Sequence, residues 1–539
     1  MTGQRFRVWI LTVLWAGAIA AVPACRNPFR TYEDEYGRLA DPQSLRSAEV
    51  LPLAEKAVDE SEGASELPSM GPPANQELEI SIEQCRAWTL ENNLDLQVSL
   101  MDPQIAATSI TEAEARFEAL FVASGSLSDA DPGQAEVFRD QFVRPFDIAP
   151  GIQIPMRTGG TASVAVPLSR RETFPGFPDD DRYATDLDFS ISQPLLRHAG
   201  RRANTHRIRI AALDSQIVQA GTKLEVIRQI AAVDRAYWLM DATKEIRAVR
   251  RRQYRRAQEQ LQQATARFEG GVGPKIEVIR ARAGLARRNE SIIIAELDVK
   301  DSQRSLKRIV NLPDADVDSK VTLVLTSQPD RVSYELDEDE LIEAALRERV
   351  ELLELELKVA QDYSTIDFEE NRKLPLFTLD YIYRIHGTGS SARRSAESAT
   401  EGRAWGWQLG LNLEVPIGNE AAEARVHRAI LTRLQRLATR TSREQSVKQE
   451  VLDALDNLHA TWRRILASDV TVGLEAQNYQ AEQGQYQLGL RNSTEVLFAE
   501  ERLADANVAS INAVLDYQIA RIDLAFATGM LLGASRITW

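Results

Sequence analysis

Cysteine and histidine are scarce in this sequence. Its 539 residues include two cysteines and five histidines. The two cysteines could form at most one disulfide. The histidines are scattered without ligand spacing, and neither HExxH nor GxSxG occurs. We therefore predict no enzyme activity, no bound metal and no cofactor.

Positive charge in excess and long apolar runs are also missing. The formal net charge is −15 at pH 7, which argues against a nucleic-acid partner. The longest apolar run, residues 8–22, follows two arginines and is shorter than the roughly 20 residues of a membrane-spanning helix. It predicts a signal peptide over residues 1–24. No other run is long enough to predict a transmembrane helix.

The sequence VPAC (22–25) follows this run. It resembles a bacterial lipobox, which implies that Cys25 is the lipidated first residue of the mature protein and anchors it to outer membrane lipid. Pro23 departs from the lipobox pattern, and Ala24 also suits ordinary signal-peptide cleavage. Residues 25–77 are rich in Pro, Glu, Ser and Ala, as expected of a linker.

Four segments alternate apolar and polar residues with a period of two, which predicts β-strands. In WGWQLGLNLEVPIG (405–418), every second residue from Trp405 to Val415 is apolar. Two tryptophans at one end of an apolar face suit a membrane interface. Each segment has the length of a tilted membrane-spanning strand. The predicted strands are 117–128, 185–196, 376–386 and 405–417.

Two long segments, 203–268 and 420–488, carry apolar residues in alternating steps of four and three. This spacing is typical of coiled-coil helices. Each segment ends at a glycine-containing turn, after which a shorter helix returns. The predicted fold class is α+β, mainly α, with long coiled-coil helices and two β-hairpins.

The order helix, strand, strand, long helix, turn, helix occurs twice along the chain. TLENNLDLQ (89–97) corresponds to LRERVELLE (346–354), with Leu90 opposite either Leu346 or Arg347. We predict two repeats, an inter-repeat segment and a C-terminal tail, at 78–312, 338–530, 313–337 and 531–539.

The two repeats differ most in the connection between their strands. Residues 129–184 form a far longer connection than residues 387–404. The sequence TGGTASVAVPL (158–168) in the longer one could add a short strand. We interpret it as part of a decorated surface loop.

Four strands cannot close a barrel, and an open sheet edge inside a membrane leaves backbone groups unpaired. If these strands span a membrane, several chains must share one barrel. Two chains would supply roughly 8 strands and three would supply roughly 12.

The doubled layout, the motif SQPLL (192–196) before the first long helix and the two helical turns resemble TolC-type outer membrane efflux proteins. The resemblance covers about residues 78–530. It implies a homotrimer with a 12-stranded barrel in the outer membrane and an α-helical tunnel in the periplasm. It also implies a passive exit duct of an efflux pump or type I secretion system, with a periplasmic adaptor and an inner-membrane pump as partners.

The two turns, at about 269–277 and 487–495, align when Gly271 is placed on Gly489. Glycine ends a helix by adopting positive φ, and an acid in the first turn of the next helix favours the helix dipole. Glu277 and Glu495 hold that place. The residues alone therefore favour two well-capped helical hairpins.

The resemblance implies more for these turns. It implies a closing latch of Glu277 with Tyr486 and Arg491, an acidic ring at Glu495, and adaptor docking at the turns. Phe498 stands where some relatives carry a second acid, which suggests a partly hydrophobic gate. The predicted adaptor contacts are Gly271, Val272, Gly273, Gly489 and Leu490.

A protein of another class remains as the alternative. A periplasmic coiled-coil scaffold or adaptor without a pore would share the long helices. It would normally show one hairpin, whereas this sequence predicts two hairpins and four strands of membrane length.

Overall fold

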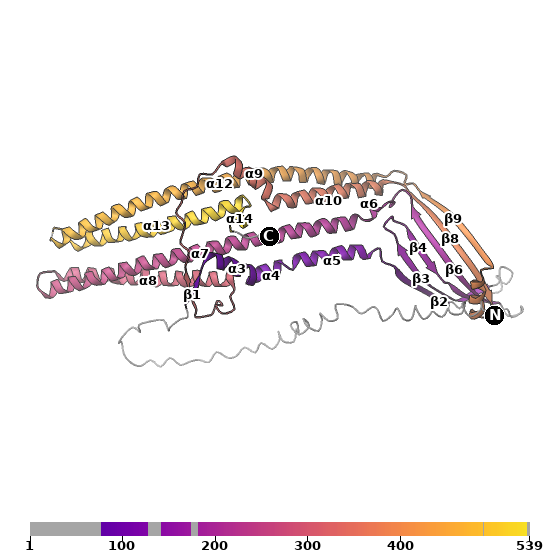
Figure 1. Ribbon diagram of the computed structural model, residues 1–539, viewed down its shortest axis with the longest axis horizontal. Coiled ribbons are helices and arrows are strands. Elements are labelled where there is room, and N and C mark those ends of the chain that lie inside the picture. The colour runs from indigo at the N-terminus through magenta and orange to yellow at the C-terminus, as the bar shows by residue number, and fades with distance from the viewer. Residues whose placement is uncertain (1–76, 128–141, 174–181, 489, 536–539) are drawn as a thin grey trace, which may run out of the picture. The chain divides into compact units, whose positions relative to one another are not determined.

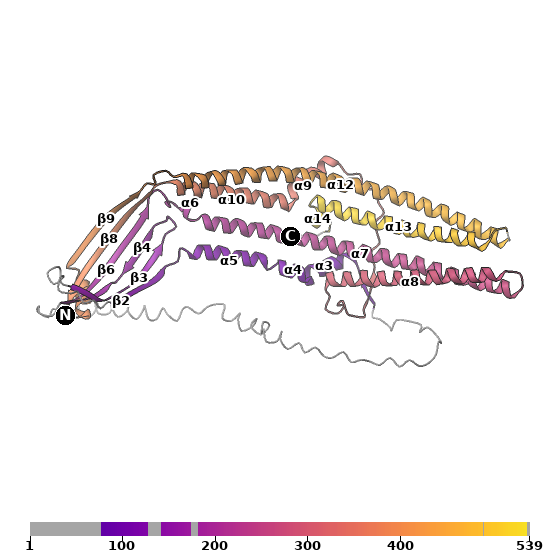
Figure 2. The same ribbon diagram turned by 180° about the vertical axis from the view of Figure 1, so that it is seen from behind.

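The computed structural model describes residues 77–127, 142–173, 182–488 and 490–535. Ala74–Trp539 forms one compact unit. Within it, a large sheet lies at one end and two helical hairpins reach the other (Figures 1 and 2). Among the described residues, none of the helices combines the length and apolarity needed to span a membrane. The predicted signal peptide and Cys25 lie outside the described residues.

Two long helices form the frame of this unit. They are α7 (His206–Glu269) and α12 (Glu420–Gln487), which confirms the predicted helices to within a few residues. In the half that is far from the sheet, each packs against the helix that follows the turn. In the half near the sheet, each packs against a shorter helix. These four partners are α8 (Lys275–Val310), α13 (Ser493–Ala527), α5 (Asp102–Ala115) and α10 (Val350–Lys373).

The residues of α12 that the heptad spacing predicts to pack are buried in the structure. Val451, Leu455, Leu458 and Ile465 are at most 3% exposed and pack against α13 residues such as Tyr517. Burial of each such side chain stabilises the fold by about 1.5–3 kcal/mol.

The helix before the strands is interrupted in each repeat. In the first, Asn93 separates α3 (Ile82–Asn92) from α4 (Leu94–Ser99). In the second, Arg349 separates α9 (Glu338–Glu348) from α10. The backbone of both residues is extended, with φ/ψ of −63°/123° and −67°/119°.

These two residues also make equivalent contacts. The Asn93 amide donates to the carbonyl of Ile309 at 2.8 Å, and the Arg349 guanidinium donates to that of Ala527 at 3.1 Å. Ile309 and Ala527 hold the same place in α8 and α13 when the two turns are aligned. The alignment that pairs Leu90 with Leu346 is therefore the one that the fold follows.

The middle of the unit holds a buried core. Tyr237 and Met240 of α7 and Leu306 of α8 are fully buried there, beside a parallel pair of short strands. The strands are β1 (Glu77–Ile80) and β7 (Thr322–Leu325). Cys85 is fully buried in the same core, and burial raises the pKa of its thiol to about 12, which agrees with an inert cysteine. The short helices α6 (Arg201–Asn204) and α14 (Leu531–Ala534) adjoin α7 and α13.

The sheet has more strands than the four expected. The described residues form seven, in the order β2-β3-β4-β6-β8-β9, with β5 pairing with both β3 and β6. All neighbours are antiparallel. The strands are β2 (Leu120–Leu127), β3 (Phe142–Pro155), β4 (Thr161–Ala165), β5 (Leu168–Thr173), β6 (Arg182–Pro194), β8 (Leu376–Gly389) and β9 (Ala404–Glu414).

The interpretation of residues 158–168 as surface decoration is therefore wrong. The four predicted strands lie in one sheet. Strands β3 and β4 lie between β2 and β6, because both form complete hydrogen-bonded ladders there. The described part of the loop 129–184 thus belongs largely to the sheet. The described chain therefore contributes more strands to its sheet than the four predicted.

Strands β4 and β5 occupy one position in the sheet. Their register against β3 and β6 is the same on both sides of residues 166–167. The backbone N–H of Val166 still donates to the Pro150 carbonyl at 2.8 Å, and the Pro167 carbonyl accepts from Asp186 at 2.9 Å. Pro167 removes one donor but does not shift the ladder. The sheet therefore has six strand positions.

One face of the sheet carries a row that is apolar at every strand position. Directly paired residues point to the same face, so each ladder row can be followed across the strands. One row is apolar from edge to edge: Phe121, Ile152, Val164, Phe189, Tyr383 and Trp407. The next row, on the opposite face, is polar at Gln153, Ser163, Ser190 and Gln408 and apolar at Leu120 and Ile382.

Helix α11 (Ala392–Glu401) lies at the end of the sheet farthest from the hairpins (Figure 1). It packs against β8 so closely that Gly387 and Gly389 have no room for a side chain, since a Cβ there would lie 2.3 Å and 2.5 Å from helix backbone atoms.

Candidate functional site: the tips of the helical hairpins

The first tip joins α7 to α8 through a glycine turn. Helix α7 ends at Glu269, and Gly271 has a φ of +69°, which confirms that glycine ends the helix with positive φ. The N–H groups of Val272 and Gly273 donate to the Arg267 carbonyl at 2.9 and 3.0 Å. These bonds satisfy a helix-end carbonyl and leave the Val272 side chain 84% exposed.

The second tip joins α12 to α13. Asn492 caps α13, because its side-chain oxygen accepts from the N–H groups of Thr494 and Glu495 at 3.0 and 3.2 Å. Leu490 is 72% exposed. Gly489, a predicted adaptor contact, lies outside the described residues.

Arg491 contacts residues of its own hairpin. Its guanidinium lies 3.2 Å from Glu495 and 3.6 Å from Glu482, and it donates to the Gln485 side chain at 3.0 Å. Among the described residues, no ion pair joins Arg491 to Glu277 within one chain. The latch that was expected from the resemblance is thus not made between these two residues inside a single chain.

Tyr486 is the predicted latch residue that connects the two hairpins. It is 8% exposed, and the Arg267 guanidinium lies over its ring, 4.6 Å from the centroid. Burial raises the pKa of the Tyr486 hydroxyl; Arg267 lowers it and Glu277 raises it further. Glu277 therefore lies within electrostatic reach of Tyr486.

Glu495 and Phe498 lie in the first turns of α13 and share one helix face by their spacing. Phe498 is 58% exposed. An acidic and an apolar side chain therefore lie close together along the same helix.

The sequence analysis did not predict the side-chain contacts that join the two hairpins above the tips. The Arg256 guanidinium lies over the Tyr479 ring, 5.2 Å from its centroid. Tyr479 precedes Tyr486, the partner of Arg267, by one heptad on α12. Arg288 of α8 pairs with Glu500 of α13 at 3.1 Å. The spacing of the two tyrosines was visible in the sequence, but which arginines meet them depends on how the hairpins pack.

The Arg288–Glu500 pair is buried. Glu500 is 3% exposed and the Arg288 side chain 12%. Burial raises the pKa of the Glu500 carboxyl, and Arg288 and Arg256 oppose that rise. The pair places a charge contact between the two hairpins where water has little access.

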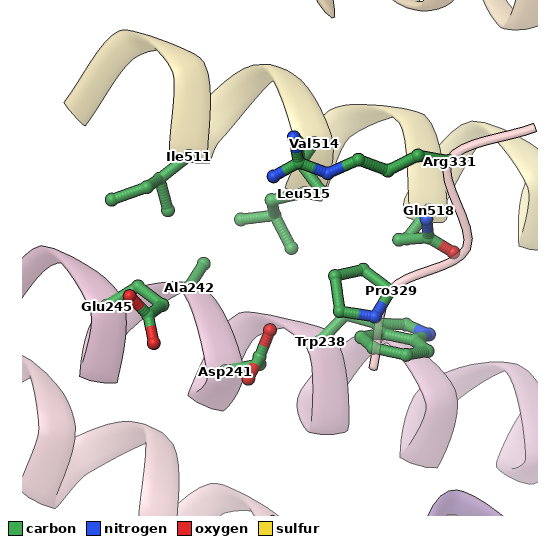
Figure 3. A pocket seen from close by; sticks show the side chains of 10 residues that line it. All are labelled: Trp238, Asp241, Ala242, Glu245, Pro329, Arg331, Ile511, Val514, Leu515 and Gln518. Carbon is green, nitrogen blue, oxygen red and sulfur yellow. The ribbon is translucent and has the colours of Figure 1, made fainter. Parts of the chain in front are cut away.

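The space between α7 and α13 is too small for a ligand. The cavity there has a volume of about 60 Å³. Figure 3 shows Pro329 beside Trp238 of α7 and Arg331 extending over Val514 of α13. Ligand sites for drug-sized molecules have volumes of about 300 Å³ or more.

Comparison with known proteins identifies the family. The family model described as "Outer membrane efflux protein" matches residues 88–312 and 341–530. Outer membrane protein TolC of Vibrio cholerae serotype O1 is 26% identical over 280 residues, which cover 50% of this chain and 61% of that relative. The match thus spans less than two thirds of that relative's length.

Solved structures share the fold at low sequence identity. The Campylobacter jejuni CmeC outer membrane channel is 15% identical, with a TM-score of 0.62 over 84% of this chain and 86% of CmeC. The open state of the Neisseria gonorrhoeae MtrE outer membrane channel is also 15% identical, with a TM-score of 0.58 over 84% and 89% of the two chains. The matched segments cover most of the chain, which therefore belongs to the outer membrane efflux protein family.

Proposed function

We propose that this protein is the outer membrane exit duct of a tripartite efflux pump or a type I secretion system. The observation that carries the proposal is the apolar ladder row that crosses all six strand positions. Phe121 and Phe189 in this row are 69% and 39% exposed. Exposed apolar faces of this extent mark contact with lipid or protein. The polar opposite face suits a water-filled lumen.

Family membership supports the location and the partners. The relatives named above are outer membrane proteins or channels. The proposed assembly is a homotrimer whose sheets lie in the outer membrane and whose hairpins extend into the periplasm. A periplasmic adaptor and an inner-membrane pump complete it, and the duct conducts substrates passively.

A coiled-coil scaffold without a pore explains the hairpins but not the sheet. Trp405 and Trp407 of β9 are 61% and 62% exposed. A scaffold in the periplasm would leave these side chains in water. The apolar face therefore favours the duct.

The proposal predicts discrete single-channel currents after the purified protein is reconstituted in a planar bilayer, together with a native mass of three chains. Protein that neither inserts into bilayers nor forms a trimer would sink the proposal and favour the scaffold. Heat-unfolded protein from the same preparation serves as the control for detergent artefacts.

We further propose that the tips form the gate and the adaptor-docking surface. Val272 and Leu490 are exposed apolar residues that an adaptor would cover, and Gly271 and Gly273 shape the first turn. Gly489 is proposed as a further adaptor contact. Glu277 and Arg491 would complete the latch with Tyr486 when three copies bring their tips together. Each exposed pair contributes little, about 0–1 kcal/mol, which suits a gate that an adaptor must open.

The gate predicts that Glu277→Gln and Arg491→Gln each raise single-channel conductance. Arg491→Gln should also increase cation preference, because it frees Glu495 from its partner at 3.2 Å. Arg282→Gln is the matched control, because Arg282 is exposed and lies on α8, the helix that carries Glu277. Conductance equal to the control in both variants would rule out the latch while leaving the duct intact.

A further inference from the structure

Two strand positions, β3 and the combined β4–β5 strand, carry the same face pattern as the rest of the sheet. On the apolar face, Ile152 and Val164 are 49% and 40% exposed and continue the row from β2 to β6. On the opposite face, the Ser163 hydroxyl lies 2.7 Å from the Ser190 hydroxyl of β6. Strands that merely covered a loop would have no reason to keep both faces in phase with their neighbours.

The turn between β3 and β4, residues 156–160, is fixed to the junction of sheet and helices on both sides. Gly159 has a φ of +94°, and a Cβ on it would lie 2.1 Å from the His198 carbonyl oxygen, next to the start of the α7 segment. Arg157 lies 3.7 Å from Glu114 of α5. The two extra strand positions are therefore anchored at the same level as β2 and β6.

Among the described strands, β2 and β9 are the two edges of the sheet. Since the six positions alternate in direction, β2 and β9 run antiparallel, so β9 of one copy can pair with β2 of the next in the same antiparallel pattern. Open edges in hydrocarbon cost several kcal/mol for each unpaired backbone group. Closure by further copies of this chain removes them.

We propose that β3 and the β4–β5 strand are membrane-facing wall strands, so that six positions in each of three copies close an 18-stranded barrel. The number of copies rests on the proposed function. At a strand spacing of about 4.8 Å and a tilt of about 40°, the backbone diameter is about 36 Å, against about 24 Å for 12 strands. Barrels of 16–18 strands hold an aqueous channel, so the tips and not the barrel set the narrowest passage.

Paired cysteine labelling tests which face of β3 meets lipid. Ile152→Cys and Gln153→Cys are labelled with a thiol-reactive fluorophore in liposomes, with Leu411→Cys and Asn412→Cys on β9 as references. Parent protein is labelled in parallel, and the buried Cys85 stays unreactive in the fold. Quenching is measured with nitroxide-bearing lipid and with aqueous iodide, and native mass gives the number of copies.

We expect lipid nitroxide to quench the fluorophore on Ile152→Cys as strongly as the one on Leu411→Cys. Iodide should quench the fluorophore on Gln153→Cys as strongly as the one on Asn412→Cys. The native mass should be that of three chains. If Ile152→Cys is quenched by iodide while Leu411→Cys is quenched by lipid, β3 lies outside the wall; the wider barrel is then wrong and the duct stands. A mass of two chains also overturns the 18-strand count.

If Leu411→Cys itself escapes the lipid quencher, the proposed function fails and the barrel with it. Val164→Cys and Ser163→Cys on β4 repeat the test should a β3 variant not fold, since they occupy the same two faces.

Discussion

Replacing Arg349 with methionine is expected to lower the free energy of unfolding by about 3 kcal/mol. Arg349 is 4% exposed and donates to Glu351, to Glu450 and to the Ala527 carbonyl, at 2.7, 2.7 and 3.1 Å. Removing it takes this donor from the Ala527 carbonyl and leaves Glu351 and Glu450 with Arg443 alone, at 3.4 and 2.9 Å. We place the effect at the lower end of the range for buried ion pairs because Glu450 is 40% exposed and can regain water.

Arg347→Met is the matched control for this prediction. Arg347 lies two residues away, is 67% exposed and pairs with Glu343, which is 76% exposed. Its loss should cost about 0–1 kcal/mol. Urea denaturation followed by circular dichroism in detergent measures both variants, and equal midpoints would refute the role of Arg349.

The same cluster sets a pH dependence. Burial raises the pKa of Glu351, but hydrogen bonds from Arg349 and its charge outweigh burial and hold the pKa below the unfolded value of 4.5. A lowered pKa in the fold stabilises the protein above the unfolded pKa, and this stabilisation is lost as the pH falls through the folded pKa. Arg349→Met should therefore reduce the acid sensitivity of the wild-type protein.

Replacing Arg288 with methionine is expected to lower the free energy of unfolding by about 3–5 kcal/mol at pH 8. Glu500 is 3% exposed, so its carboxylate would stay in the interior without its partner at 3.1 Å. Because this pair joins α8 to α13, the variant should also loosen the contact between the two hairpins. Arg287→Met, at the exposed neighbouring position, should have little effect.

The sign of the pH effect separates this explanation from a general packing defect. Burial already raises the pKa of Glu500, and loss of Arg288 removes the charge that opposes the rise. A raised carboxyl pKa favours the folded state at low pH, and that gain is lost as pH rises through the folded pKa. The defect should shrink between pH 8 and pH 5, and Arg288→Met/Glu500→Gln should recover much of the stability. A defect that does not change with pH would contradict a buried-charge origin.

The sequence by itself determined the long helices and the hairpins. Heptad spacing specifies which residues of α12 are buried, such as Val451 and Leu455, because helix periodicity depends only on nearby residues. The turn at Gly271 was also predictable, since positive φ is a local requirement that glycine meets.

The sheet was predictable only in part. The four strands with clean alternation were recognised, but β3 was not, because prolines such as Pro150 and Pro155 oppose a strand assignment. In the fold, Pro150 lacks a backbone N–H but still joins the ladder, because its carbonyl accepts a hydrogen bond from Val166. Pairing partners far along the chain decide whether such a segment becomes a strand.

The contacts between the two hairpins were decided by tertiary structure alone. Arg267 meets Tyr486, and Arg288 meets Glu500, across more than two hundred residues of sequence. Which side chains meet depends on the axial register and rotation of one hairpin against the other. Local propensity carries no information on either quantity, so the sequence determined the helices and their caps, while the packing of the two repeats decided which charges hold the tips together.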